Sequence, residues 1–322
     1  MRYILEGSVR RSASRIRVNA QLINASEGAD HLWAERFDRD LADVFAVQDE
    51  LVAKIVEALV GKLTVAELRE RYRPASLEAY DLCLRGRAEY YHSVEAGVDA
   101  IPLFERAIAL DPRYAEAYRW LAVMQCLGWL HMNRPMDPIR QLSMASAKKA
   151  VELAPEDPSA HCGLAAVLLY ERLWAESAKE YETSLRLNPN EADAWDGLSD
   201  LKVMEGRGEE AVACSLRALR LSPHPTCPYL WGLGQAQYAA GQYEAVVKTL
   251  RDEATYRTGS RRFLAAALAQ LDRLVEAREE GRLYLARHPH SRISYWVETQ
   301  PFRDLATRDR FVEGYRKAGL PD

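Results

Sequence analysis

The stretch from Pro155 to Pro189 reads PEDPSAHCGLAAVLLYERLWAESAKEYETSLRLNP, and these two prolines are 34 residues apart. Another 34 residues separate Pro189 from Pro223. Pro112 lies one such interval plus nine residues before Pro155, and Pro289 lies two intervals less two residues after Pro223. Each proline follows a segment with an amphipathic helical pattern, and proline disfavours helix in the residue before it. The spacing therefore predicts tandem helix pairs that repeat about every 34 residues.

The side chains within the repeats are in phase with the prolines. The first helix of each pair carries large residues, leucines and small residues in a fixed order, and the second carries alanines around an aromatic ring. Small residues at the eighth and twentieth positions allow the two helices to approach closely, and large residues fill the space between them. The pattern is carried, in the six successive repeats, by Leu84 and Ala88, Tyr118 and Leu121, Leu164 and Ala165, Trp195 and Leu198, Trp231 and Gly234, and Leu264 and Ala265.

On these residues, the segment 81–290 resembles the tetratricopeptide repeat family. The resemblance implies a mainly α protein, with a right-handed superhelical solenoid of about six helix pairs over residues 77–290. Residues 291–322 are expected to form a capping helix that shields the last apolar face. The nine extra residues of the second repeat lie within 129–138, which predicts either a loop between its helices or a longer first helix.

Residues 1–73 have a different pattern of polar and apolar residues. A short β run begins at Tyr3, and polar and apolar residues alternate over 15–23 and 31–37, which predicts three strands. An apolar stripe over 41–63 then predicts a helix. The strings YILEGSVR, IRVNAQLI, HLWAERFDR and VQDE in this region resemble the end of the TolB amino-terminal-like α/β domain. The resemblance implies a small partial α/β region, of a kind that precedes tetratricopeptide repeats in bacterial adenylate/guanylate cyclase proteins and follows winged-helix regulators.

The composition excludes several classes of partner. Lys and Arg number 43 against 47 Asp and Glu, giving a net charge of −4, so we expect no nucleic-acid partner. No apolar run approaches the ~20 residues of a membrane span, and the first residues lack a signal core, so we expect a cytoplasmic protein without a membrane partner. The five cysteines are scattered and odd in number, which disfavours a disulfide framework or a zinc site.

No motif of a known chemistry is present. The sequence has no phosphate-binding glycine loop and no metalloprotease motif, and Gly232-Leu233-Gly234 falls inside a helical pattern, where it favours close helix packing. The resemblance to the cyclase proteins extends to none of their metal-binding aspartates. We therefore predict no catalytic residue, no metal site and no cofactor, and the chain is predicted not to be an enzyme.

The tetratricopeptide resemblance places four positions of each first helix in the concave groove. In this family such grooves bind a segment of a protein or peptide partner. Asp193, Asp196 and Asp200 recur at spacings of three and four, which favours a basic segment, although a solvated acidic stripe would show the same spacing. The predicted groove residues are Arg85, Glu89, Arg119, Asp193, Asp196, Asp200, Trp231, Gln235 and Tyr238.

The sequence thus favours a non-catalytic interaction scaffold that acts in bacterial signalling. The alternatives are the regulatory carboxy-terminal half of a class III adenylate/guanylate cyclase, or that of a winged-helix transcriptional regulator. A partial α/β region would leave an unpaired strand edge, so self-association through residues 1–40 is also predicted.

Overall fold

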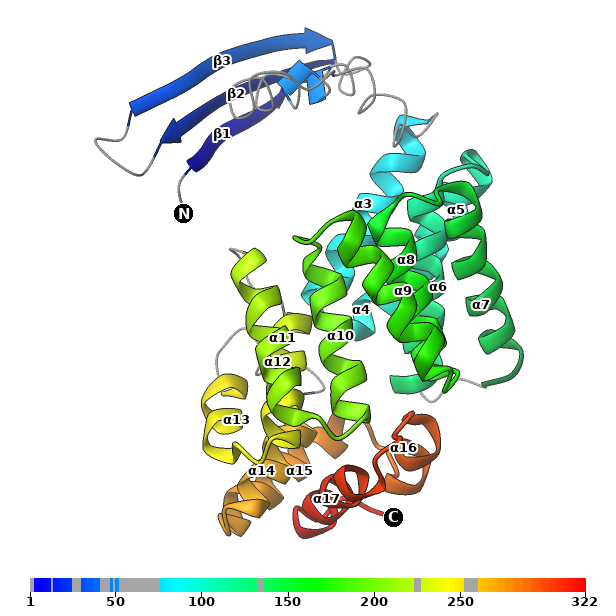
Figure 1. Ribbon diagram of the computed structural model, residues 1–322, viewed down its shortest axis with the longest axis vertical. Helices are drawn as coiled ribbons and strands as arrows, with labels where there is room; N and C mark the ends of the chain where they lie inside the picture. The colour runs from blue at the N-terminus through cyan, green and yellow to red at the C-terminus, as the bar shows by residue number, and fades with distance from the viewer. Residues whose placement is uncertain are drawn as a thin grey trace. The chain divides into compact units, whose positions relative to one another are not determined.

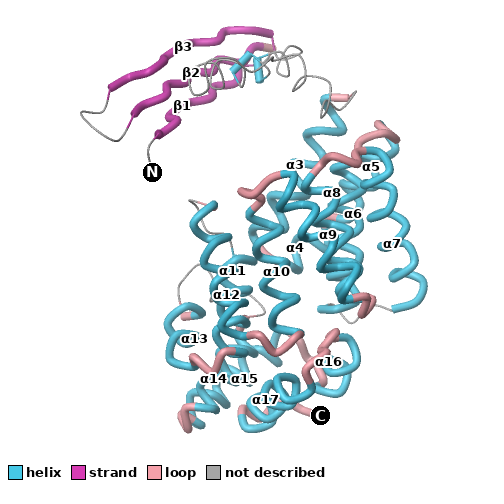
Figure 2. The backbone as a smooth tube through the Cα atoms, in the orientation of Figure 1, coloured by secondary structure: helices cyan, strands magenta, loops and turns pink. Residues whose placement is uncertain are grey.

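The computed structural model describes residues 3–12, 14–24, 30–40, 47–48, 50–51, 76–131, 136–222, 227–251 and 260–322. The chain divides into two compact units, Met1–Leu77 and Glu78–Asp322. Figure 1 gives the labels of the helices and strands, and Figure 2 distinguishes the two by colour. The predicted boundary falls between residues 73 and 77, of which 74–75 lie outside the described residues.

The first unit contains an antiparallel meander of three strands, as the alternating pattern predicts. The strands are β1 (Tyr3–Ser12), β2 (Arg15–Asn24) and β3 (Asp30–Asp40), in the order β1-β2-β3. One face of β2 is buried through Ile16 and Val18, which pack with Phe37 of β3 and with Val47. Of the predicted helix over 41–63, residues 47–48 and 50–51 are helical, and the rest lies outside the described residues.

The strand β1 carries apolar side chains that the described residues leave uncovered. Val9 pairs with the buried Val18 but is 66% exposed, and Leu5 is 50% exposed. Because β1 lies at one edge of the sheet, one row of its backbone groups is free of a neighbouring strand in this part of the chain. This is the edge at which self-association was predicted.

The second unit is an array of helix pairs in which the two members of each pair pack against one another. Successive pairs follow each other along the unit from α3 to α15 (Figures 1 and 2). The second member of the first pair is divided into two helices. The pairs are α3 (Leu77–His92) with α4 (Val94–Asp99) and α5 (Ile101–Leu110), α6 (Ala115–His131) with α7 (Met136–Leu153), α8 (Pro158–Tyr170) with α9 (Trp174–Leu187), α10 (Ala192–Met204) with α11 (Gly208–Leu221), α12 (Cys227–Ala239) with α13 (Tyr243–Leu250), and α14 (Arg261–Gln270) with α15 (Leu274–Arg287).

The turns inside four of these pairs share one backbone conformation. A residue with positive φ ends the first helix, and the amide that follows it donates to a carbonyl five residues back, at 2.9–3.0 Å. This left-handed residue satisfies the free carbonyls of the helix end and reverses the chain within a few residues. The positive-φ residues of these turns are Arg172, Gly206, Gly241 and Asp272.

The second repeat absorbs its extra residues by lengthening both helices. The helices α6 and α7 have 17 and 18 residues, whereas α8 and α9 have 13 and 14. The sequence left a loop or a longer first helix open, and the structure extends the first helix and the second as well. Residues 132–135 between them lie outside the described residues.

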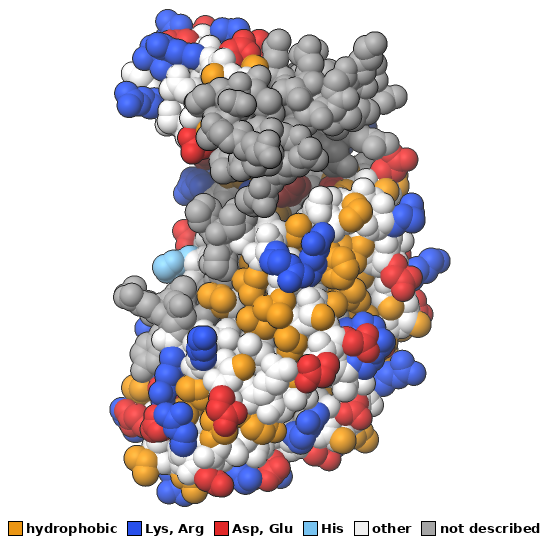
Figure 3. All heavy atoms as spheres, turned by 60° about the vertical axis from the view of Figure 1, so that its left-hand side comes forward, with side chains coloured by type: hydrophobic (Ala, Val, Ile, Leu, Met, Phe, Trp, Pro, Cys, Tyr) orange, Lys and Arg blue, Asp and Glu red, His pale blue; other side chains and the backbone are white. Residues whose placement is uncertain are grey.

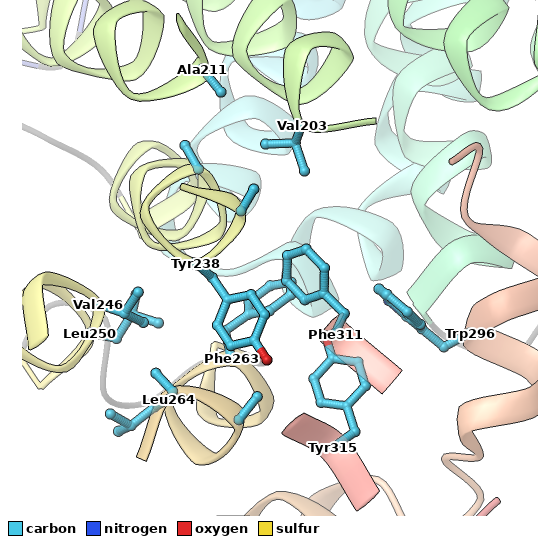
Figure 4. Packing of buried hydrophobic residues seen from close by; sticks show 14 of the residues in the cluster. Val203, Ala211, Tyr238, Val246, Leu250, Phe263, Leu264, Trp296, Phe311 and Tyr315 are labelled. Carbon is cyan, nitrogen blue, oxygen red and sulfur yellow. The ribbon is translucent and has the colours of Figure 1, made fainter. Parts of the chain in front are cut away.

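Two helices, rather than the single capping helix that was predicted, follow the array. They are α16 (Ile293–Thr299) and α17 (Leu305–Lys317). The helix breaks between them because Gln300 precedes a proline and is therefore extended, with ψ of 134°. Figure 4 shows Phe311 and Tyr315 of α17 packed with Phe263 of α14 and Tyr238 of α12. The last apolar face is thus covered from within the chain. Among the described residues, no helix is long and apolar enough to cross a membrane.

Candidate functional site

A cavity of about 160 Å³ lies along the first helices of successive pairs in the second unit. Its walls come mainly from α6, α8, α10 and α12, with Arg262 added from α14, and these helices contact one another in that order. Each first helix places its groove-facing residues toward the same space, because the repeat holds them in one register. Figure 3 shows one face of the molecule, on which hydrophobic side chains gather among interspersed charges of both signs.

Asp193 of α10 is held by two groups from neighbouring repeats. Its Oδ2 accepts a hydrogen bond from Arg119 Nη2 of α6 at 2.6 Å, and its Oδ1 accepts one from the Tyr229 hydroxyl of α12 at 2.5 Å. Arg119 is only 5% exposed, and its guanidinium carbon lies 3.9 Å from the ring centroid of Trp120. Burial alone would lower the pKa of Arg119, but the Asp193 carboxylate raises it well above its usual value. This ion pair therefore ties α6 to α10 across the cavity wall.

Asp200 lies two turns farther along α10 and is also engaged. It accepts hydrogen bonds from the Tyr170 hydroxyl of α8 at 2.7 Å and from Gln235 Nε2 of α12 at 2.9 Å. Burial raises the pKa of Asp200 to about 6, although these two hydrogen bonds lower it. The carboxyl of Asp200 thus joins three first helices in the same way as Asp193 does.

Asp196 lies between these two carboxylates and is the one with an open acceptor. Its Oδ1 is buried and has no hydrogen-bond partner in the part of the chain that the structure describes. Burial, and then the charges of Asp193 and Asp200, raise the pKa of Asp196 well above its usual value, which favours the protonated form. Gly232 of α12 makes room here, since a Cβ at that position would lie 2.6 Å from this same oxygen.

The structure brings most of the predicted groove residues together. Arg119, the three aspartates, Trp231 and Gln235 all line the cavity. Tyr238 does not, and its prediction as a groove residue is wrong. It is 1% exposed, stacks on Phe311 at 4.3 Å between ring centroids, and donates to the Arg310 carbonyl at 2.8 Å. The fifth repeat is shifted by a residue, which turns Tyr238 toward α17 and into the core.

Arg85 and Glu89 lie outside the lining of this cavity. Both are exposed on α3, and Arg85 lies 4.0 Å from Asp81. Their predicted role at the groove stays a prediction.

The sequence analysis missed Arg262, which also lines the cavity. It is 7% exposed, and its Nε has no hydrogen-bond partner among the described residues. Arg262 is the fifth residue of the sixth repeat, counted from Thr258, and Arg119 and Asp196 hold the fifth positions of repeats two and four. Applying the same groove positions to the sixth repeat would have identified it.

Comparisons with known proteins support the fold and leave the function open. No family model matches the chain. A curated relative named "Putative adenylate cyclase 3", from Rhizobium meliloti (strain 1021), is 39% identical over 177 residues. The match covers 53% of this chain, and the chain spans only 30% of the relative's length.

Two solved structures match the chain, one of them with a similar fold. The Cut9–Hcn1 hetero-tetramer of the APC/C matches with a TM-score of 0.51 at 12% identity, over 85% of this chain and 52% of that one. The TPR protein TTC0263 of Thermus thermophilus matches with a TM-score of 0.37 at 20% identity, over 73% of this chain and 98% of that one. The 34-residue period, the helix pairs of the described residues and the fold similarity to Cut9–Hcn1 identify a helical solenoid of the tetratricopeptide type, preceded by a small region of strands.

Proposed function

We propose that the chain is a cytoplasmic, non-catalytic interaction scaffold of bacterial signalling, which holds a segment of a partner protein in the cavity of its helical array. The observation that carries the proposal is the cavity itself, whose walls come from five first helices in one register. A site assembled from several repeats gives the residue of the partner segment that enters it contacts from several helices at once.

The carboxyl groups of the cavity support a binding role rather than a reactive one. Asp193 and Asp200 are each held by two hydrogen bonds from other helices, so they fix the walls in position. A residue that is fully hydrogen-bonded inside a wall shapes the site without offering a free group for chemistry.

These contacts remove the main support for a basic partner segment. That prediction depended on three free carboxylates, but Asp193 already has a cation, Asp200 has two donors, and burial favours the protonated form of Asp196. On α10, Oδ1 of Asp196 has no hydrogen-bond partner among the described residues, but it is buried within the wall. The three aspartates therefore do not offer a set of free charges to a basic segment.

A regulatory part of a class III adenylate cyclase is the second candidate, and the 39% identity to the rhizobial relative favours it. In that case residues 1–73 would be part of a TolB-like α/β domain that links a catalytic region to the helical array. The counterpart behind a winged-helix regulator is a variant of the same proposal. Purified chain incubated with ATP and Mn²⁺ is expected to form no cyclic AMP above a heat-treated control, and turnover would contradict the non-catalytic proposal.

The binding proposal is tested by filling the cavity. Ala166 of α8 lines it, so Ala166→Trp adds bulk inside, and Ala175→Trp adds the same bulk on the exposed surface of α9. Proteins cross-linked to wild type in cell extract are expected to persist with Ala175→Trp and to be lost with Ala166→Trp, at equal melting temperatures. Partners that persist in both variants would show that binding occurs elsewhere.

A further inference from the structure

Arg262 is a buried cation without an anion in the part of the chain that the structure describes. Its neighbour Arg261 pairs with Glu280 at 2.6 Å, and Arg119 in the same cavity pairs with Asp193 at 2.6 Å. Arg262 is as deeply buried as Arg119, but among the described residues it forms no ion pair and its Nε has no hydrogen-bond partner. A charge removed from water without a partner is unfavourable, so such a group is expected where a ligand supplies the missing anion.

Aromatic side chains surround the guanidinium of Arg262, and its Nε is fully buried among them. Its central carbon lies 4.9 Å from the ring centroid of Phe263, 5.9 Å from that of Trp231 and 6.0 Å from that of Trp296. Aromatic rings attract a cation, but they do not replace the strong acceptors that its five N–H donors require. Trp296 does not line the cavity, but its Nε1 is a further buried donor without a partner in the described ranges. Figure 4 shows Trp296 beside Phe311 and Tyr315 in the aromatic core.

The chemistry of the missing anion follows from the shape and charge of the cavity. A guanidinium presents parallel N–H groups that match the two oxygens of a carboxylate. The anions of an unmodified protein segment are carboxylates, so the proposed ligand supplies this group. About 160 Å³ is the volume of roughly five water molecules, which accommodates one side chain or one chain end.

We propose that Arg262 receives a carboxylate of the partner segment in the cavity, from an acidic side chain or from a carboxy-terminus. The inference rests on the proposed function, since it names the chemistry that the scaffold recognises. Trp231, which lies in the cavity 6.0 Å from Phe263 between ring centroids, packs against the aliphatic part of the bound residue.

Short peptides test the proposal on the full chain. The first pair is N-acetyl-glycyl-glutamyl-glycinamide and the same peptide with glutamine, and the second pair is N-acetyl-triglycine with a free carboxylate and with an amide. Binding is followed by tryptophan fluorescence, since Trp231 and Trp296 lie about 6 Å from the guanidinium. Ionic strength is held constant because exposed charges respond to salt. The acid of at least one pair is expected to bind about tenfold more tightly than its amide, and the pair that responds identifies the source of the carboxylate.

The variants assign the effect to Arg262. Arg262→Gln is expected to abolish the preference for the acid. Arg262→Lys is expected to retain only part of it, because lysine keeps the charge but lacks the parallel N–H groups of a guanidinium. Arg278→Gln removes the same charge from the exposed surface of α15 and is expected to change nothing. Circular dichroism verifies that each variant is folded.

Two outcomes would overturn the inference, and both are separable from the proposed function. Either acid and amide bind equally in both pairs, or the preference survives in Arg262→Gln. If Ala166→Trp still abolishes partner capture in those cases, the scaffold stands and only the carboxylate receptor fails.

Discussion

Removing the Asp193 carboxylate is expected to destabilise the helical array strongly. The change Asp193→Asn keeps the shape of the side chain but leaves Arg119 buried without its anion, on a guanidinium whose Nε already has no partner among the described residues. The same side chain also accepts the hydroxyl of Tyr229, so helices of three repeats meet at this one group. The perturbation therefore acts on the contacts between repeats rather than within one.

The size of the effect follows from the burial of the pair. Breaking a buried ion pair by removing one partner costs about 3–5 kcal/mol, because the remaining charge stays in the interior. The asparagine carbonyl keeps one hydrogen bond to Arg119, which offsets about 1 kcal/mol of this loss. We therefore expect the free energy of unfolding to fall by about 2–4 kcal/mol. At roughly 2–4 °C per kcal/mol for a domain of this size, the melting temperature should fall by about 4–16 °C.

A double-mutant cycle measured by urea unfolding separates the charge from the packing. Arg119→Met removes the unpaired cation, so the double variant Arg119→Met/Asp193→Asn is expected to be more stable than Asp193→Asn alone. Glu279→Gln serves as the control, since it breaks the exposed pair with Arg282 and should change stability by less than about 0.5 kcal/mol. A loss below about 1 kcal/mol for Asp193→Asn, or strictly additive effects in the double variant, would refute the reasoning.

Three further predictions concern pH, packing and the strand edge. The pKa of Asp200 in the folded protein is raised to about 6 from a usual value of 3.8. Its contribution to the free energy of unfolding is therefore fully present below pH ~4 and is lost as the pH rises through 6. In urea titrations, the free energy of unfolding of Asp200→Asn should therefore rise relative to that of wild type by up to about 3 kcal/mol between about pH 4 and 8. A difference that stays constant with pH would contradict this. Gly86→Ala should lower stability by about 1–3 kcal/mol in thermal unfolding, since its Cβ would lie 2.5 Å from the Phe104 ring. Leu5→Lys with Val9→Lys should reduce self-association in light scattering at unchanged helix content; equal particle mass in both proteins would exclude this edge.

The repeat architecture could be predicted because its signals are local. Prolines 34 residues apart, and small residues where helices cross, are visible in a single sequence. The turn residues follow a weaker rule, since Gly206 and Gly241 suit a positive φ but Arg172 and Asp272 adopt it as well. All four turns share the hydrogen bond from the following amide to a carbonyl five residues back, whichever residue has the positive φ. The residue type alone therefore does not identify these turns.

The sequence predicted which residues lie at the candidate site, but not which of them bind each other. The repeat frame placed Asp193 and Arg119 on the groove, but they are 74 residues apart, and nothing in the sequence shows that they bind each other. The acidic stripe therefore suggested three free charges, whereas Asp193 and Asp200 are hydrogen-bonded and Oδ1 of Asp196 is buried without a partner among the described residues. Tyr238 was misassigned because a shift of one residue on a helix turns a side chain by about 100°, which here exchanges the groove for the core.

Arg119 and Arg262 hold the same position in their repeats but have different surroundings. Both are the fifth residues of their repeats, both are buried, and both line the same cavity. Arg119 finds its carboxylate inside the chain and so stabilises the contact between repeats. Within the described part of the chain, Arg262 has aromatic neighbours in place of an anion, and these satisfy its charge only in part. A solenoid that needed only stability would have an apolar residue there, since a well-packed hydrophobic side chain is often no less stable than a buried charge. The unpaired cation is therefore better explained by what enters the cavity than by what holds the array together.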